Sequence, residues 1–167
     1  MIHDESQIEP GADGTLVDLR CSAVVVHNRE FLLIRRRNDD WVLPGGRPRD
    51  GESMASCARR ETYEETGLHV IPGRCAFVGE VIAPDRGTRV VDLVFLAAVS
   101  AAQYESPVVG EAGAAPQWVP VDQLQTLRLS PPIAGFLPSL CTGGGRTAPY
   151  LGNLWRPGRA GVLPADR

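Results

Sequence analysis

Three glutamates near the middle of the chain have the spacing of one helix face. Glu61, Glu64 and Glu65 are three and four residues apart, so on an α-helix their side chains fall within a sector of about 100°. Like charges at this spacing repel, and each close pair costs an isolated helix about 0.2–0.5 kcal/mol. A divalent cation would offset that repulsion. Because all three groups are oxygen ligands, we expect Mg²⁺ or Mn²⁺, which also binds substrate phosphates, rather than zinc.

An acidic helix face is often only a solvated surface, but these glutamates belong to a longer pattern. Gly46 and Glu52 precede them, Arg60 adjoins Glu61, and Gly67 follows. Seven specified positions would match by chance with a probability on the order of 10⁻⁸ per register at average composition. The pattern therefore favours metal-assisted transfer at phosphorus over a bare charged surface.

The elements that must position these residues are read from apolar periodicity. Residues 53–66 predict a helix that Ser53 or the acidic stretch before it can cap and that Gly67 ends. Two β-rich runs, 16–26 and 30–37, predict a hairpin, and the segments 75–83 and 88–99 predict a second one. Residues 101–116 look like a loop. A short strand at 118–120 and a helix over 121–129 follow.

This order of elements predicts an α/β fold in which helices cover both faces of a mixed sheet. We expect residues 1–15 to form a flexible acidic arm and residues 16–137 to form one domain. Residues 138–167 are expected to form an irregular tail rich in Gly, Pro and Arg. The apolar residues between Tyr150 and Trp155 could anchor this tail to the domain.

Composition and charge exclude several classes of protein. The net charge of −3 argues against binding of nucleic acid polymers, and no run approaches the ~20 apolar residues of a membrane helix. The N-terminal residues lack the pattern of a signal peptide. The four cysteines form no metal-binding or paired motif, so we expect reduced thiols in a cytoplasmic protein. All 17 basic residues are Arg, so any phosphate clamp must be a guanidinium.

The segment GRPRDGESMASCARRETYEETGL, from Gly46 to Leu68, resembles the Nudix box, the signature of the Nudix hydrolases. Its only departure is mild, since Thr62 stands where the family usually has an aliphatic residue. The likeness covers about residues 18–137. It implies a Nudix-type α/β/α sandwich with a catalytic loop–helix–loop, and a Nudix hydrolase domain over 16–137. The implied activity is hydrolysis of a nucleoside diphosphate linked to another group.

The resemblance also implies roles for individual residues. Glu61, Glu64 and Glu65 would bind the metal, with a carbonyl of Gly45 or Gly46 as a further ligand. Arg60 would orient the cluster, and Glu52 would support the metal site from the loop end. The general base stays open, with Glu61 as the first candidate. Glu111, seven residues before Trp118, stands where many relatives carry an additional metal-binding or catalytic glutamate.

Two arginines are candidates for binding the substrate's phosphates. Arg35 leaves the second strand near the expected site, and Arg47 directly follows the glycine pair. The scattered acids, by contrast, carry no motif, and we expect solvated surface or turn positions for Glu30, Asp39, Asp40 and Asp92.

The substrate is specified only coarsely. Pro84 lies sixteen residues beyond the box and resembles a marker of ADP-ribose pyrophosphatases, which favours ADP-ribose or a nucleotide sugar. The near alternative is a nucleoside triphosphate pyrophosphatase that clears oxidised or non-standard nucleotides. A sensor that binds a nucleotide without turnover is a second alternative, which the intact glutamate set disfavours. A purely structural interaction module would leave the acidic cluster unexplained. A homodimer is left open.

Overall fold

The computed structural model describes residues 14, 16–84, 88–106, 108–110, 114–142 and 148–157. The expected arm over residues 1–15 therefore lies outside the described residues, apart from Gly14. Glu111 and the tip of the second hairpin, residues 85–87, also lie outside them.

The described chain alternates strands with short helices, and the two expected hairpins and the central helix are present. The elements in chain order are β1 (Leu16–His27), β2 (Glu30–Arg36), β3 (Trp41–Val42), β4 (Gly45–Gly46), α1 (Met54–Thr66), β5 (Ile71–Ile82), β6 (Thr88–Ala98), α2 (Ala101–Tyr104), β7 (Ala114–Pro120), the 3₁₀ helices η1 (Val121–Thr126) and η2 (Leu137–Thr142), and β8 (Tyr150–Asn153).

Strand β1 organises the mixed sheet, whose strand order is β3-β2-β1-β6-β5-β8. Along one edge β1 runs parallel to β6, with Leu16 opposite Thr88 and Val25 opposite Ala97. The other edge is divided between two partners. The glycines of β4 pair with Cys21 and Ser22, whereas β2 pairs only at the hairpin end. This division places the glycine pair beside the middle of β1.

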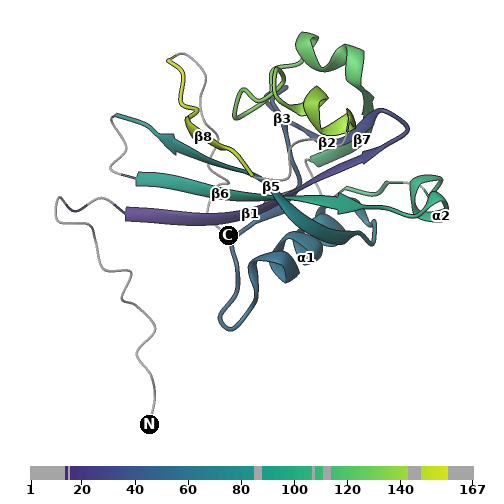
Figure 1. Ribbon diagram of the computed structural model, residues 1–167, viewed down its shortest axis with the longest axis horizontal. Coiled ribbons are helices and arrows are strands. Elements are labelled where there is room, and N and C mark those ends of the chain that lie inside the picture. The colour runs from purple at the N-terminus through teal and green to yellow at the C-terminus, as the bar shows by residue number, and fades with distance from the viewer. Residues whose placement is uncertain are drawn as a thin grey trace.

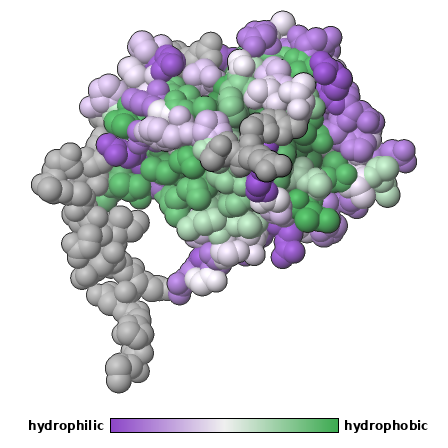
Figure 2. Space-filling model, in the orientation of Figure 1, coloured by the Kyte–Doolittle hydropathy of each residue, from purple (hydrophilic) through white to green (hydrophobic). Residues whose placement is uncertain are grey.

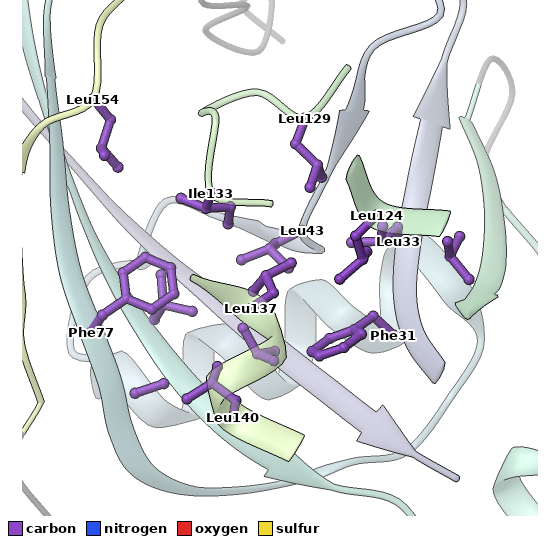
Figure 3. Packing of buried hydrophobic residues seen from close by; sticks show 14 residues of the cluster. Phe31, Leu33, Leu43, Phe77, Leu124, Leu129, Ile133, Leu137, Leu140 and Leu154 are labelled. Carbon is purple, nitrogen blue, oxygen red and sulfur yellow. The ribbon is translucent and has the colours of Figure 1, made fainter. Parts of the chain in front are cut away.

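Helical layers lie on opposite sides of the sheet, with α1 on one side and the two 3₁₀ helices on the other (Figure 1). The main core fills the second interface, where Phe31, Phe77, Leu124, Leu137 and other buried side chains pack together (Figure 3). Two smaller clusters lie between the sheet and α1. One includes Ala23 and Leu68, and the other includes Cys21 and Cys57. The predicted α/β/α sandwich is confirmed.

Helix α1 has the predicted caps. The Ser53 side chain accepts a hydrogen bond from the Ser56 amide, and Gly67 ends the helix in the left-handed conformation, with φ of 74°. Thr62 is fully buried, and its hydroxyl donates to the Ala58 carbonyl at 2.7 Å. Because that hydroxyl is satisfied within the helix, Thr62 is tolerated where an aliphatic residue is usual.

Three segments differ from the expectation. The helix predicted over 121–129 is a 3₁₀ helix that ends at Thr126, and the loop over 101–116 contains the short helix α2. The tail expected to be irregular adds η2 and β8, and β8 runs parallel to β5. The backbone of an edge strand offers unpaired hydrogen-bonding groups, which local sequence patterns do not reveal. Leu154, just after β8, joins the main core.

Some apolar side chains remain on the surface at the start of β1. Leu16 is 49% exposed and Val17 is 47% exposed, and Figure 2 shows apolar colour on this part of the molecule. None of the described helices combines the length and apolar character needed to cross a membrane.

Leu137→Ala should destabilise the fold, because Leu137 is fully buried in the main core and its truncation leaves a cavity. We expect a loss of about 2–5 kcal/mol in the free energy of unfolding, measured by urea denaturation. Val109→Ala is the control, since Val109 is 67% exposed and should change stability little. Equal losses in the two variants would contradict the assignment of η2 to the core.

Candidate active site

The glycine pair of β4 is in close contact with both β1 and α1. A Cβ atom at Gly45 would lie 2.3 Å from Ser22 Oγ and 2.6 Å from Ser22 Cα. A Cβ atom at Gly46 would lie 2.4 Å from the Glu61 carboxyl carbon. Real Cβ atoms do not approach other heavy atoms this closely. The absence of side chains therefore brings the Glu61 carboxylate directly against the backbone of β4.

Arg60 connects most of the acidic side chains around α1. Its Nη1 donates to Glu61 Oε1 at 2.6 Å and to Glu64 Oε2 at 3.1 Å. Its Nε and Nη2 donate to the two Glu52 oxygens, each at 2.8 Å. Nη2 also donates to the Arg47 carbonyl at 3.1 Å, which ties the loop before α1 to the helix. These contacts agree with the orienting role expected of Arg60.

Glu52 serves as the anchor of the loop. The two bonds from Arg60, followed by a backbone N–H donated by Arg49, lower the pKa of Glu52 to about 2. The same carboxylate, with Glu61, raises the pKa of Arg60 above its usual value. Glu64 lies nearer the solvent and accepts a second guanidinium bond from Arg49 at 3.0 Å. Glu52 thus ties the loop before α1 to Arg60 in the middle of the helix.

Glu65 is the most buried member of the glutamate set. Its Oε2 accepts the Gly45 amide at 2.8 Å. Burial, with a smaller contribution from the nearby Glu61 charge, raises the pKa of Glu65 to about 7, because the Gly45 amide and the guanidiniums of Arg20 and Arg36 offset these causes only in part. The protein by itself therefore supplies too little positive charge to keep Glu65 fully ionised at neutral pH.

The donor set fits a divalent cation of the magnesium type. All the acidic groups here bind through oxygen, and Gly46 leaves the space in which the Glu61 carboxylate lies. The carboxylate of Glu65 lacks compensating charge, which a cation would provide. Within the described ranges no three His, Cys, Asp or Glu side chains already form a metal-binding cluster. Arg60 instead holds Glu61 and Glu64.

The two arginines predicted to bind phosphate lie outside this arrangement. Arg35 pairs with Asp39 at 2.7 Å in the β2–β3 turn, and both side chains are about half exposed or more. The Arg47 guanidinium pairs with Asp18 through bonds of 2.7 and 2.9 Å, although its backbone carbonyl contacts Arg60. Their roles toward a substrate stay predictions.

Two other arginines lie closer to the glutamates. Arg20 Nη2 donates to the Gly45 carbonyl at 2.5 Å. Arg36, the neighbour of Arg35 on β2, is partly buried, and this burial lowers its pKa, as does the nearby charge of Arg20. Both charges act on Glu65. Sequence reasoning missed both arginines. Side chains alternate along a strand, so Arg35 and Arg36 lie on opposite faces of β2, and this alternation was the available signal for considering Arg36.

The expectation of a solvated surface or turn position is wrong for Asp92, and Asp40, although it lies in the turn between β2 and β3, is buried. Asp92 accepts a hydrogen bond from the Ser22 hydroxyl at 2.9 Å, and burial raises its pKa. Asp40 is 4% exposed and pairs with Arg128. In the parallel register, Asp92 lies opposite Arg20. The available signal was the single acid within the apolar run VVDLVFL of β6.

A cavity lies between the sheet and the 3₁₀ layer. Arg20, Arg36, Glu80 and Asp92 supply charged groups to its lining. Its remaining walls are largely apolar and include Val42, Phe77, Ile133 and Leu154 among others. A site with charge at one end and an apolar wall suits a ligand that carries phosphates on a less polar group.

This geometry agrees with the comparisons to known proteins. The NUDIX domain family matches residues 19–140. A protein of Bacillus subtilis named as the uncharacterized Nudix hydrolase YvcI is 30% identical over 119 residues, which are 71% of this chain and 75% of that protein. The chain therefore belongs to the Nudix hydrolase family. It is an enzyme of the pyrophosphohydrolase type, and members of this family use divalent metal ions.

Two further comparisons bear on function and fold. An ADP-ribose pyrophosphatase of Methanocaldococcus jannaschii is 35% identical over 79 residues, which are 44% of this chain and 46% of that protein. The crystal structure of a MutT protein from Methanosarcina mazei has a TM-score of 0.62 at 23% identity, covering 77% of this chain and 96% of that one. The second likeness shows the fold.

Gly46→Ala should displace the Glu61 carboxylate, because the new Cβ would lie 2.4 Å from its carboxyl carbon. We expect turnover to fall by about 10²-fold, the scale of a 1 Å misplacement of a reacting group. Gly135→Ala is the matched control, since nothing lies within 4 Å of a Cβ there. Turnover would be compared in steady-state assays, with circular dichroism to verify folding. Equal turnover in both variants would refute the close-contact argument.

Glu65→Gln should remove a pH-dependent loss of stability. The folded pKa of about 7 exceeds the unfolded value of about 4.3, so the stability is fully present below pH 4.3 and is lost as pH rises through 7. In EDTA, the wild type should lose up to about 3 kcal/mol more unfolding free energy than the variant between pH 4.5 and 8.5. Saturating Mg²⁺ should abolish that difference. Identical pH slopes in urea titrations with EDTA would contradict the assignment.

Proposed function

We propose that this chain is a Mg²⁺-dependent hydrolase that cleaves the diphosphate linkage of nucleoside diphosphate derivatives, with ADP-ribose or a nucleotide sugar as the favoured substrate. One observation carries the proposal. Glu61 and Glu65 contact the glycine pair, and Arg20, which donates to the Gly45 carbonyl, lines a cavity together with Arg36, Glu80 and Asp92. Guanidinium groups bind phosphate oxygens through paired donors.

Glu61, Glu64 and Glu65, with the carbonyl of Gly45 or Gly46, would hold the cation. When bound, a divalent cation neutralises charge on the phosphate oxygens and lowers the pKa of a water molecule. Mn²⁺ would serve in place of Mg²⁺, since both prefer oxygen ligands.

The chain's own residues then orient the reaction. Arg60 holds Glu61 and Glu64 in place. Glu61 is the first candidate for the general base, which takes a proton from the attacking water on a carboxylate oxygen. The water oxygen attacks phosphorus, and the bond from that phosphorus to the bridging oxygen breaks. From ADP-ribose and one water this gives AMP and ribose 5-phosphate. Glu111 stays a second candidate for the base, and it lies outside the described residues.

ADP-ribose is favoured by two independent features. The relative from Methanocaldococcus jannaschii is named as an ADP-ribose pyrophosphatase. Pro84, which follows β5, stands at the position that resembles the marker of such enzymes. Nucleoside triphosphates test the pyrophosphatase alternative, and ligand binding without turnover tests the sensor alternative.

The substrate class would be measured as phosphate released by a coupled phosphatase. The panel holds ADP-ribose, other nucleoside diphosphate sugars, dinucleoside polyphosphates and nucleoside triphosphates, each with Mg²⁺, with Mn²⁺ and with EDTA. Metal-dependent release from the diphosphate-linked compounds would support the proposal. Turnover confined to triphosphates would favour the alternative pyrophosphatase. No turnover of any compound, with ligands still raising the melting temperature, would favour the sensor.

Glu64→Gln should lower turnover by several orders of magnitude and leave the fold intact, because Glu64 is 36% exposed and its loss removes a metal ligand rather than core packing. Glu105→Gln, at an exposed position after α2, is the control with the same chemical change. Both would be assayed on the best substrate of the panel. A wild-type rate in Glu64→Gln would remove Glu64 from the metal site.

The location and the oligomeric state of the protein are supported by its cysteines and by its exposed apolar residues. The four cysteines, Cys21, Cys57, Cys75 and Cys141, are all free thiols, which supports a reducing cytoplasm as the location. A homodimer stays a prediction. The apolar side chains exposed at the start of β1 are a surface that a second copy could cover. Sedimentation equilibrium would decide the oligomeric state.

A further inference from the structure

Arg20 holds a group that the proposed function needs for another purpose. Its Nη2 donates to the Gly45 carbonyl at 2.5 Å, and that carbonyl is one of the two proposed as a ligand of the cation. A carbonyl oxygen that faces a guanidinium at this distance is a poor ligand for a second positive charge, because the two cations would repel each other across it. If Gly45 is the ligand, the two contacts compete.

A second partner for the guanidinium already lies beside it. Arg20 Nε is 3.8 Å from Asp92 Oδ2, an ion pair without a hydrogen bond. Asp92 Oδ2 accepts from the Ser22 hydroxyl, whereas Oδ1 is buried and has no hydrogen-bond partner among the residues that the structure describes. A buried acceptor without a donor is unfavourable. A small rotation of the Arg20 guanidinium toward Asp92 would satisfy it.

Arg36 lies close enough to Arg20 for their charges to interact unfavourably. The two side chains line the same cavity, and after burial the charge of Arg20 is the next largest cause that lowers the pKa of Arg36. Two partly buried guanidiniums of like charge would be stabilised by an anion that contacts both, in addition to the nearby carboxylates of Asp92 and Glu65. A substrate phosphate is such an anion. The pair therefore has the character of a phosphate site that is incomplete while Arg20 is bound to Gly45.

We propose that Arg20 couples cation binding to substrate binding. In the metal-free protein Arg20 occupies the Gly45 carbonyl. When the site takes a divalent cation, Arg20 releases that carbonyl, pairs with Asp92 Oδ1, and with Arg36 contacts a phosphate of the substrate. Asp92 is then the positioning residue for Arg20. The inference rests on the proposed function, since it uses the Gly45 carbonyl as a ligand, and it adds an arginine that the box pattern does not include.

The coupling predicts that removing the Arg20 side chain strengthens cation binding, whereas removing a merely structural side chain would weaken it. Arg20→Ala removes the competitor for the Gly45 carbonyl, so the metal-free protein should bind Mn²⁺ about tenfold more tightly. The same change should weaken binding of a diphosphate about tenfold, because one phosphate contact is lost. In the wild type Mn²⁺ should strengthen binding of the diphosphate. In Arg20→Ala that strengthening should be reduced, since linkage between two ligands is reciprocal.

The experiment uses the full chain after EDTA treatment and two probes. Free Mn²⁺ would be followed by electron paramagnetic resonance, and binding of α,β-methylene-ADP, whose bridging carbon resists hydrolysis, by calorimetry with and without Mn²⁺. Arg20→Gln, which keeps more of the side chain, is the second variant, and thermal melting verifies that each variant folds. Arg29→Ala is the matched control, because it removes the same charge from an exposed position in the turn between β1 and β2.

Asp92→Asn provides an independent test of the positioning role. It should weaken binding of α,β-methylene-ADP in the presence of Mn²⁺ and should not tighten the binding of Mn²⁺ alone, because Asp92 pairs with the released Arg20 and does not compete for the Gly45 carbonyl. A rise in Mn²⁺ affinity only in the two Arg20 variants would support the coupling.

Two results would overturn the inference. Only the second would also contradict the metal site of the proposed function. If the wild type binds Mn²⁺ and hydrolyses its substrate, but Arg20→Ala and Arg20→Gln bind Mn²⁺ no more tightly, Arg20 does not compete for the carbonyl and only the coupling fails. If the wild type does not bind Mn²⁺, the metal site of the proposed function fails and the coupling fails with it.

Discussion

The site depends on the close approach of α1 to the glycine pair of β4. No side chain separates Gly46 from the Glu61 carboxylate, and the Gly45 amide reaches Glu65 from the same two-residue strand. The pairing of β4 with Cys21 and Ser22 holds these glycines beside the middle of β1. Carboxylates that would otherwise be solvated on a helix surface are thereby held against backbone, where their charge is poorly screened.

Because the carboxylates of α1 are held against β4, their negative charges must be compensated by nearby positive groups. Arg60 neutralises the outer part of the cluster by binding Glu52, Glu61 and Glu64. It leaves Glu65 without a guanidinium of its own, and burial keeps the pKa of Glu65 near 7. The outer carboxylates therefore order the loop and the helix, whereas the inner one retains the charge deficit that makes the site receptive to a cation. The outer Glu61 and the inner Glu65 are four residues apart on α1, which is about one helical turn.

The cavity depends on strands that come together from distant parts of the chain. Arg20 on β1 and Asp92 on β6 are neighbours through a parallel register, and Gly79 of β5 leaves room for Leu154 from the segment after β8. The C-terminal residues thus complete one wall of the cavity. A substrate pocket assembled this way can differ between relatives while the box stays the same, which agrees with the general separation of fold from specificity.

The box, its helix with both caps, the two hairpins and the layered α/β fold were all predictable from the sequence. The box, the helix and the hairpins rest on interactions between residues close in sequence, so spacing encodes them, whereas the layered fold follows from the order of these elements. Only the tertiary structure decided that Arg36 rather than Arg35 lines the cavity, that Asp92 is withdrawn from solvent and that β8 joins the sheet. These outcomes depend on which strands become neighbours and in what register, and no local pattern contains the free energy of contacts between segments seventy residues apart.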